Sequence, residues 1–200
     1  SIVEVFGQHN MENLSAAKEV CNSIGIGDKD FYKAISTFRG AAKRLQKLGS
    51  GHTTDVFLDF AHAPSKVKAT VNALKNQYPY RKLVACLELH TFSSLNPNFL
   101  PEYKGSISQA DVQVVYYNPK TLEHKKLPKI DPGFIKQKFG EKNLLVFTDE
   151  QELLTFLESH FWDNTNLLLM SSGNYAGLDL KKLAATITED DDFPRKYLQF

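Results

Sequence analysis

The sequence predicts an α/β fold with a mainly parallel, doubly wound sheet flanked by helices. Short apolar runs recur along residues 56–171, and segments with the apolar spacing of amphipathic helices lie between them. Such alternation is typical of a parallel sheet whose strands are joined by helical crossovers. The strands expected in this sheet are Val56–Phe60, Lys82–Leu89, Asp111–Tyr117, Leu144–Thr148 and Leu167–Ser171.

Helices are expected between these strands and after the last one. The first of them places Val67, Val71 and Leu74 on one stripe, so it packs against the sheet. Pro64 suits the start of this helix, where no backbone N–H is needed. The expected helices are Ser65–Tyr78, Pro97–Gln109, Pro132–Phe139, Glu150–Phe161 and Leu178–Ile187.

The residues before the sheet have mostly helical spacing. After a candidate short strand at Ile2–Phe6, a helix is expected from His9 until Gly25 stops it. A second helix is expected over Asp30–Phe38, with Asp28 as its cap. The residues that should face inward from this second helix are Phe31, Ala34, Ile35 and Phe38.

Three further segments are predicted from local pattern. Lys43–Leu48 alternates like a strand, which Gly49 closes. Lys120–Lys129 is polar, rich in lysine and without periodicity, so we expect an exposed excursion there. Glu189–Phe200 begins with an acidic run and is expected to lie on the surface.

The composition argues against several classes of protein. With 24 basic and 23 acidic residues the formal net charge is +1, so no global field favours nucleic acid or a membrane surface. No apolar run approaches the ~20 residues that span a bilayer, and no leader-like segment opens the chain. Cys21 and Cys86 lie far apart, as expected of free thiols in a reducing compartment. We therefore expect a cytoplasmic protein; the sequence gives no sign of an oligomeric state.

The most informative stretch is the end of the strand Val56–Phe60. Its apolar run leads directly into Asp59, and His62 follows before the next helix begins. The carboxyl ends of strands in such sheets are where ligands bind, so both side chains are candidate ligand contacts. Asp is also a common helix cap, and the local pattern leaves both roles of Asp59 open.

A second strand end also runs into polar residues. Lys82–Leu89 leads into His90, and because this strand follows the first one along the chain, we expect His90 to stand beside Asp59 and His62. Two imidazoles and a carboxylate could bind an anion, a metal or a peptide. The spacing matches no zinc signature, so no metal ligand is assigned.

The last predicted strand leads into a loop of small residues, Ser171–Gly177. A loop of this kind exposes backbone N–H groups at a helix start, which favours anions such as carboxylates. It lacks the Gly-Lys-Ser/Thr of a phosphate loop, and an ordinary strand-to-helix turn stays open as the alternative.

Three polar residues near the beginning of the chain are candidate nucleotide contacts. Asn10 and Asn13 lie three residues apart at a helix start, so their amides face the same way and suit the edge of a base. Arg44, on the alternating segment, offers a fork of donors to phosphate oxygens. Helix capping for the asparagines and simple solvation for the arginine are the alternatives.

Taken in order, these segments resemble the Mur ligase family of ATP-dependent enzymes, which build the peptide stem of the bacterial cell wall. Gly7–Ala17 is similar to the adenine-contacting helix near the end of the family's central domain. Phe38, Gly40 and Lys43-Arg44 resemble the entry to its C-terminal domain, and Asp59–Pro64 resembles its Asp-Tyr-Ala-His-x-Pro element. The resemblance spans Gly7 to about Ile187.

The resemblance implies a division of the chain and a set of ATP contacts. Residues 1–40 would be the helical end of the ATP-binding central domain or a connector, and residues 41–200 a Rossmann-like C-terminal ligase domain. Asn10 and Asn13 would contact the adenine of ATP, Arg44 its phosphates and Asp59 its ribose. The Mg²⁺ ligands and the phosphate loop would precede this segment in a longer enzyme. The fragment alone would therefore be inactive, and it is assigned no catalytic residue.

Within the family, the pattern is closest to the murein peptide ligases, which join the tripeptide L-Ala-γ-D-Glu-meso-diaminopimelate to UDP-N-acetylmuramate. Alanine-adding ligases typically carry Pro-His-Arg-Tyr-Ser-Arg where this chain has Leu89–Ser94, so both arginines are missing. Met170–Tyr175 is similar to the Met-Ser-Asn-Gly-Gly-Phe of the peptide ligases, whereas Gln46 and Ala63 depart from the family's usual Glu and His. The substrate-binding residues implied are His62, His90, Ser93, Ser94, Ser172, Gly173, Asn174 and Tyr175.

Three other functions remain open at this stage. The first is an alanine-adding ligase of the same family, and the second is a non-catalytic module that binds a nucleotide or a peptide. The third is a stand-alone enzyme that uses Asp59, His62 and His90 as its acid–base set. A dinucleotide enzyme would need Gly-x-Gly-x-x-Gly after its first strand, and the chain has no such turn.

Overall fold

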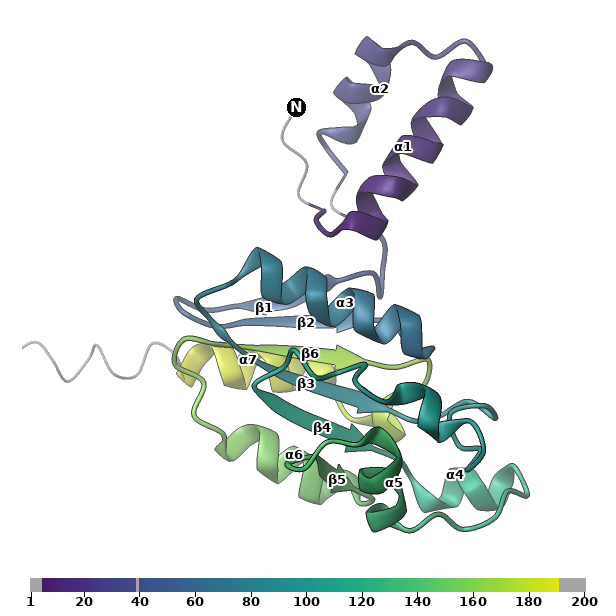
Figure 1. Cartoon of the computed structure of the whole chain (residues 1–200). Coiled ribbons are helices and arrows are strands. Elements are labelled where there is room, and N and C mark those ends of the chain that lie inside the picture. Colours follow the sequence, from purple (N-terminus) through teal and green to yellow (C-terminus); the bar gives the residue numbers. More distant parts are fainter. Residues whose placement is uncertain (1–4, 39, 191–200) are drawn as a thin grey trace, which may run out of the picture.

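The computed structural model describes residues 5–38 and 40–190 and shows a six-stranded sheet between two layers of helices (Figure 1). The strand order is β1-β2-β6-β3-β4-β5; β1 is antiparallel to β2, and the other neighbours are parallel. The predicted mainly parallel sheet is confirmed, and it contains all five expected strands. The strands are β1 Gln46–Ser50, β2 Asp55–Asp59, β3 Lys82–Glu88, β4 Val112–Tyr116, β5 Leu145–Phe147 and β6 Thr165–Met170.

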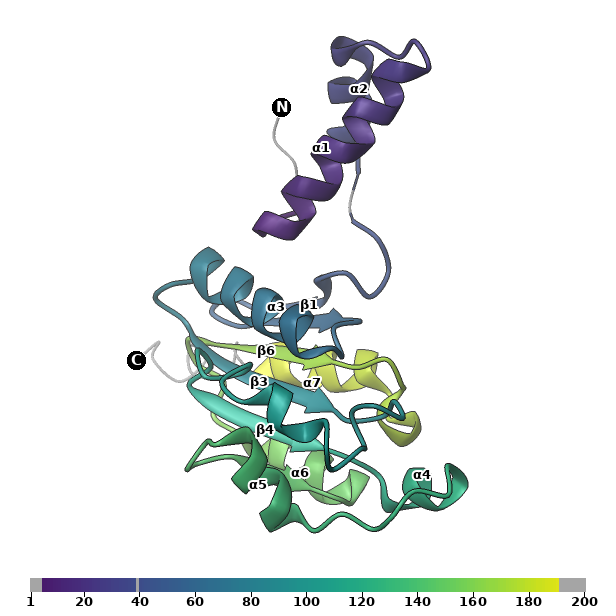
Figure 2. The ribbon, with the colours of Figure 1, turned by 45° about the vertical axis from the view of Figure 1, so that its right-hand side comes forward.

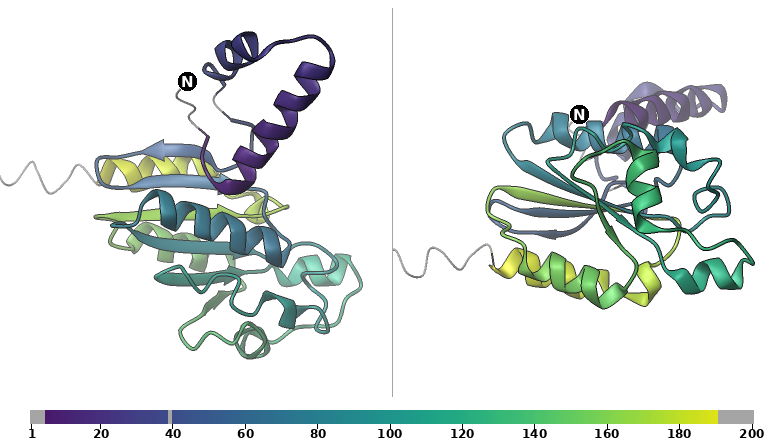
Figure 3. Two further views of the ribbon diagram at one scale, coloured as in Figure 1. Left: turned by 45° about the horizontal axis from the view of Figure 1, so that its top comes forward. Right: turned by 60° about the horizontal axis from the view of Figure 1, so that its bottom comes forward.

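Side chains alternate between the two faces of the sheet and fill two separate cores. In β2, Phe57 belongs to one core, whereas Val56 and Leu58 belong to the other. The helices therefore lie in two layers, as the doubly wound prediction requires (Figure 3). The first core is covered by α3 (Pro64–Gln77), the 3₁₀ helix η1 (Leu100–Tyr103) and α5 (Pro132–Phe139), and the second by α6 (Glu150–Ser159) and α7 (Leu180–Asp190).

The prediction of a helix over Pro97–Gln109 is wrong. The segment consists of turns around η1. Its buried apolar residues do join the first core beside the sheet. However, Pro101 has no backbone N–H to donate, and Gly105 has a φ of 70°, so the chain cannot continue as an α-helix. The buried apolar residues of the segment are Leu100, Tyr103 and Ile107.

The excursion Lys120–Lys129 is more ordered than its sequence suggested. It overlaps a short helix, α4 (Pro119–His124), whose N-cap Asn118 accepts a hydrogen bond from the backbone N–H of Lys120 at 2.9 Å. Leu122 is only 2 % exposed and joins the first core. Three of its lysines, Lys120, Lys126 and Lys129, are exposed as predicted, whereas Lys125 is half-buried, and the segment that carries them is anchored.

The first strand lies three residues later than predicted and includes Gly49. Lys43 and Leu45 have left-handed φ values of 55° and 46°, so the residues before Gln46 form a turn rather than a strand. A Cβ on Gly49 would lie 3.1 Å from the backbone oxygen of Ala184 in α7. The glycine is therefore needed for the close approach of α7 to this edge of the sheet.

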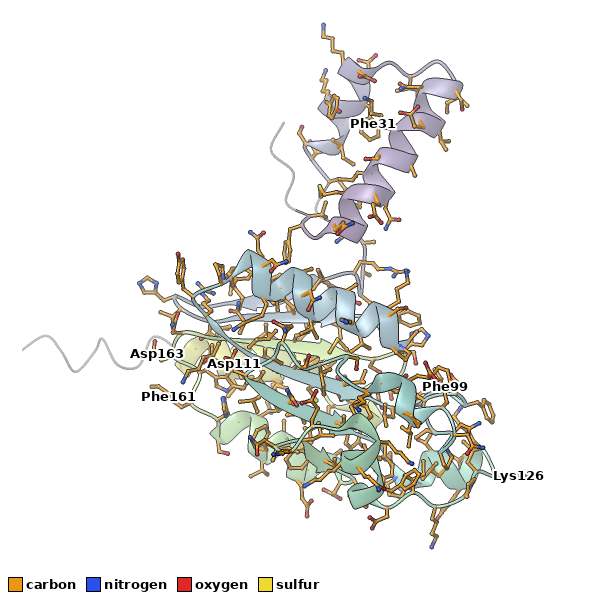
Figure 4. The ribbon with its side chains drawn as sticks, viewed as in Figure 1. Phe31, Phe99, Asp111, Lys126, Phe161 and Asp163 are labelled. Atoms are coloured by element: carbon orange, nitrogen blue, oxygen red, sulfur yellow. The ribbon has the colours of Figure 1, made fainter. Side chains whose placement is uncertain are left out.

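Two helices before the sheet form a hairpin that extends away from it (Figure 2). They are α1 (Gln8–Ser23) and α2 (Asp28–Ile35), and both confirm the expected helices. Phe31 lies between them and is 8 % exposed (Figure 4). The division of the chain at residue 40 stays a prediction, although the hairpin lies apart from the two layers around the sheet.

Details of the second helix differ from the prediction. Gly27 is its N-cap, and Asp28 is instead the first helical residue, where its carboxylate pairs with Lys18 at 2.9 Å. Ala34 and Phe38 are exposed rather than inward. The helix ends at Ile35, before Phe38. Two packed helices bury only the side chains along their line of contact, and Ala34 and Phe38 lie outside that line.

Two terminal predictions fall largely outside the described residues. Of the candidate strand Ile2–Phe6 only residues 5 and 6 are described, and they are not in a strand. The acidic tail is described only to Asp190, where α7 ends. Within the described ranges, no helix has both the length and the apolar character needed to cross a membrane.

Candidate functional site

The parallel strands end at one edge of the sheet, and the loops that follow them carry most of the predicted site residues. In Figure 4, Phe99 and Lys126 mark this carboxyl edge, whereas Asp111 and Asp163 mark the opposite one. The edge is organised around two buried carboxylates, Asp59 at the end of β2 and Glu88 at the end of β3.

His90 does not stand beside Asp59 and His62 as the order along the chain suggested. β6 pairs with both β2 and β3 and lies between them. His90 therefore faces the loop after β6, and a Cβ on Gly173 would lie 2.7 Å from its ring. The acid–base set proposed for a stand-alone enzyme is consequently not assembled.

Asp59 is neither a helix cap nor an open ligand contact in this structure. The following helix begins at Pro64 with Ala63 as its N-cap, and no side chain caps it. One carboxylate oxygen of Asp59 accepts the backbone N–H of Ala61 and the other that of Leu45, both at 2.7 Å. The side chain is 3 % exposed, so its role in this state is to tie the turn before β1 to the end of β2.

This turn presents Arg44. The backbone N–H of Arg44 donates to Ala41 at 3.1 Å, and the Gln46 side chain accepts the N–H of Lys43 at 3.0 Å. Leu45 is held in its left-handed conformation by Asp59. Arg44 is thus exposed on a turn that Asp59 pins, rather than in the strand where it was expected.

Arg44 and Asn10 line one cavity of about 330 Å³ between the hairpin and β1. The Asn10 amide donates to the Phe6 carbonyl at 2.8 Å, and this bond fixes its orientation. Asn13, one turn later on α1, is exposed. Neither asparagine caps the helix, since its N-cap is Gly7. A larger open cavity of about 770 Å³ lies between the first turn of α1 and α3.

His62 lies in the loop after β2. One ring nitrogen, Nδ1, is 2.8 Å from the Phe60 carbonyl oxygen, and the Phe60 ring packs edge-on against the imidazole at 5.1 Å. The hydroxyl of Tyr103 donates to the His62 backbone carbonyl. The buried Tyr103 therefore holds the backbone of this loop, and the imidazole of His62 is partly exposed.

The central polar group of the edge is Glu88, which was not among the predicted site residues. It is 2 % exposed and accepts hydrogen bonds from the hydroxyl of Ser171 and from the backbone N–H of Tyr175, the latter at 3.0 Å. Its other oxygen is 3.8 Å from Nδ1 of His90. The signal that identified Asp59, a carboxylate at the end of an apolar strand, also applies to Glu88.

The loop after β6 is tightly held at both ends. The N–H of Gly173 donates to the Ser171 hydroxyl at 2.6 Å. The Tyr175 hydroxyl, at the start of η2 (Tyr175–Gly177), donates to the carbonyl of Cys86 or Met170, and the ring stacks on Tyr116 at 6.0 Å. Burial raises the pKa of the Cys86 thiol to about 12 and that of the Tyr175 phenol well above its usual 10.

The predicted residues in this loop and in the one after β3 differ in their exposure. Tyr175 is buried, and so is Ser94, whose hydroxyl accepts the N–H of Thr91 at 2.9 Å within its own turn. Ser93 and Asn174 are exposed. The Ser172 hydroxyl is shielded and has no hydrogen-bond partner among the described residues.

The described residues contain no group of three or more His, Cys, Asp or Glu side chains that could hold a metal ion. Both oxygens of Asp59 and one oxygen of Glu88 already accept internal hydrogen bonds. We therefore assign no Mg²⁺ ligand within the described ranges.

Comparison with known proteins places this geometry in context. UDP-N-acetylmuramate–L-alanine ligase of Chlorobium chlorochromatii is 30% identical over 90% of this chain, and that of Pelodictyon phaeoclathratiforme is 32% identical over 88%. The chain spans about two fifths of the length of these curated relatives, 39% and 38%.

Solved structures share the fold at lower identity. UDP-N-acetylmuramate–alanine ligase of Thermotoga maritima matches with a TM-score of 0.68 at 19% identity, covering 96% of this chain and 40% of that one. A murein peptide ligase of Psychrobacter arcticus matches with a TM-score of 0.59 at 21% identity, covering 93% and 38%. The family model described as "Mur ligase, glutamate ligase domain" matches residues 43–173, which is more than half of the chain. This chain belongs to the Mur ligase family.

Proposed function

We propose that this chain is the C-terminal part of a cytoplasmic, ATP-dependent ligase that joins the murein tripeptide L-Ala-γ-D-Glu-meso-diaminopimelate to UDP-N-acetylmuramate. The observation that carries the choice of acceptor is the turn after β3. Residues 91–94 form a compact turn of hydroxyl and aromatic side chains, with no arginine to clamp the carboxylate of a small amino acid. A larger acceptor, held through several contacts, fits such a turn better.

The proposed reaction passes through an acyl phosphate. The γ-phosphoryl group of ATP is transferred to the carboxylate of UDP-N-acetylmuramate, and ADP leaves. The amine of the acceptor then attacks the acyl carbon, phosphate leaves, and the amine loses a proton as the amide forms. The residues of this chain would bind the acceptor and cover the nucleotide, which excludes water and aligns the amine. The Mg²⁺ ligands and phosphate loop are proposed to lie in the rest of a longer protein, so this segment alone would be inactive.

ATP is proposed to bind against the cavity that Asn10 and Arg44 share. In the full-length ligase, Arg44→Ala is expected to raise the KM for ATP, or lower kcat, by about ten- to a hundredfold, because a charge-assisted contact is worth roughly 1.5–3 kcal/mol. Lys43→Ala removes a neighbouring charge outside the cavity and should change either constant less than about twofold. If steady-state kinetics show equal effects of the two substitutions, Arg44 acts only through general surface charge and makes no specific contact with ATP.

L-Alanine is the second candidate acceptor, because the relatives that match most of this chain are named UDP-N-acetylmuramate–L-alanine ligases. Competition kinetics on the full-length ligase separates the two. We expect kcat/KM for the tripeptide to exceed that for free L-alanine by at least about a hundredfold, or roughly 2.7 kcal/mol of discrimination. A higher kcat/KM for L-alanine would refute the tripeptide and establish the alternative.

A further inference from the structure

The lysine-rich segment after β4 is anchored to the core at the carboxyl edge of the sheet. α4 is anchored by Leu122, and the segment returns to the core at Ile130, which is 7 % exposed. The hydroxyl of Tyr117 donates to the Ile130 carbonyl at 2.5 Å and ties the two ends of the excursion together. The segment therefore has a defined position, at the end of the sheet toward which β3 and β4 run (Figure 1).

This anchored segment brings a cation to the turn after β3. Nζ of Lys125 lies 4.2 Å from the centroid of the Phe92 ring. Phe92 is 61 % exposed and lies in the Thr91–Ser94 turn, directly after His90. An ammonium over an aromatic face is held in place while its N–H donors stay available for a second partner.

Several lysines that are held in place by contacts have a carboxylate partner, whereas Lys125 has none among the described residues. Lys18, Lys47 and Lys75 each pair with an aspartate at 2.7–3.1 Å. Within the described ranges, Lys125 has no carboxylate within ion-pair distance, and the two buried carboxylates of the edge already have internal donors. A fixed cation without a counter-ion at a ligand-binding edge is complementary to an anionic ligand.

We propose that Lys125, seated on Phe92, is a specificity-determining residue that binds a diaminopimelate carboxylate of the acceptor peptide. This assignment rests on the proposed function, because it takes the acceptor to be a peptide with several carboxylates. Lys125 contacts no reacting atom. Its contribution is affinity and selectivity for the anionic acceptor over a neutral one.

The test uses the full-length ligase and two forms of the tripeptide, one with free and one with amidated diaminopimelate carboxylates. Lys125→Met should raise the KM for the free tripeptide about fivefold, the upper end of what an exposed ion pair contributes. The wild type should prefer the free over the amidated peptide by a similar factor, and the variant should lose this preference. A purely structural role would not remove selectivity between two acceptors.

Two matched controls separate a local contact from general charge. Lys126→Met removes the adjacent positive charge, and Lys138→Met removes a lysine that lies over another ring, Phe134, on α5. Both should leave the preference for the free peptide and the KM for ATP within about twofold of wild type. Phe92→Ala should raise the KM for the free tripeptide as Lys125→Met does. Phe92→Tyr keeps the aromatic face and should therefore keep the KM and the preference of the wild type.

The outcomes distinguish this proposal from the proposed function. If the wild type uses the tripeptide and Lys125→Met keeps its preference for free carboxylates, the role of Lys125 is refuted and the peptide-ligase function stands. An equal loss in Lys126→Met also refutes it, since long-range charge then explains the result. If the wild type uses L-alanine better than the tripeptide, both are overturned.

Discussion

Glu88→Ala is expected to destabilise the domain by about 2–4 kcal/mol and to abolish measurable use of the acceptor in the full-length ligase. Truncation leaves the Ser171 hydroxyl and the Tyr175 N–H without their acceptor in a buried site, and each unsatisfied donor costs about 1–3 kcal/mol. For a domain of this size the loss corresponds to a fall of about 5–15 °C in Tm. Thermal denaturation and acceptor kinetics measure the two effects.

Two variants separate the site role of Glu88 from its contribution to stability. Glu88→Gln keeps an oxygen that can accept a hydrogen bond, so it should recover most of the lost stability. It should still raise the KM for the amine acceptor, because the negative charge beside His90 is gone. Asp55→Asn alters another buried carboxylate, at the opposite end of β2, that pairs with Lys47 and Arg81. It should lower Tm without a selective change in the acceptor KM. A selective acceptor defect in Asp55→Asn would show that Glu88 acts through stability alone.

Gly173→Ala is expected to lower kcat/KM for the acceptor at least about tenfold while leaving the KM for ATP within twofold. The added Cβ would lie 2.7 Å from Cγ of the His90 ring and 2.8 Å from Oε2 of Glu88, closer than real contacts allow. Glu88 is held by two donors, so the imidazole or the loop must move, at a cost of about 1–3 kcal/mol in stability.

Gly177→Ala is the control for backbone strain in the same loop. Gly177 has a φ of 92°, but a Cβ there meets nothing within 4 Å. Alanine at this position should cost about 1–2 kcal/mol of stability and leave the acceptor KM nearly unchanged. If Gly177→Ala impairs the acceptor as strongly as Gly173→Ala, loop rigidity rather than contact with His90 explains both.

The fold was predictable because its inner strands β2, β6 and β3 are buried on both faces. All six residues of β6 are buried, and its continuous apolar run Leu167–Met170 is typical of a strand covered on both faces. Segments with mixed signals were harder. The buried residues of 97–109 follow helical spacing, yet Pro101 and Gly105 decide the local conformation, and Leu122 alone anchors a segment whose other residues are mostly polar.

The candidate site was harder to predict because it depends on strand order. Local pattern identified Asp59, His90 and the loop after β6, but nothing in it shows that β6 lies between β2 and β3. Because of that arrangement, His90 lies beside Gly173 rather than Asp59, and Glu88 is the central polar group of the carboxyl edge. The hydrogen bond from Leu45 to Asp59 joins residues 14 positions apart, and its left-handed donor has no sequence signature.

The central place of β6 has a consequence for how the chain folds during synthesis. β2 and β3 are made more than seventy residues before Thr165–Met170, and each lacks this shared neighbour until that strand is inserted between them. While the ribosome translates the intervening residues, the nascent sheet keeps two unpaired apolar strand edges, the kind of surface that chaperones bind. A premature stop before residue 165 would leave those edges permanently open, so the truncated product should be directed to aggregation or degradation rather than to a smaller folded domain.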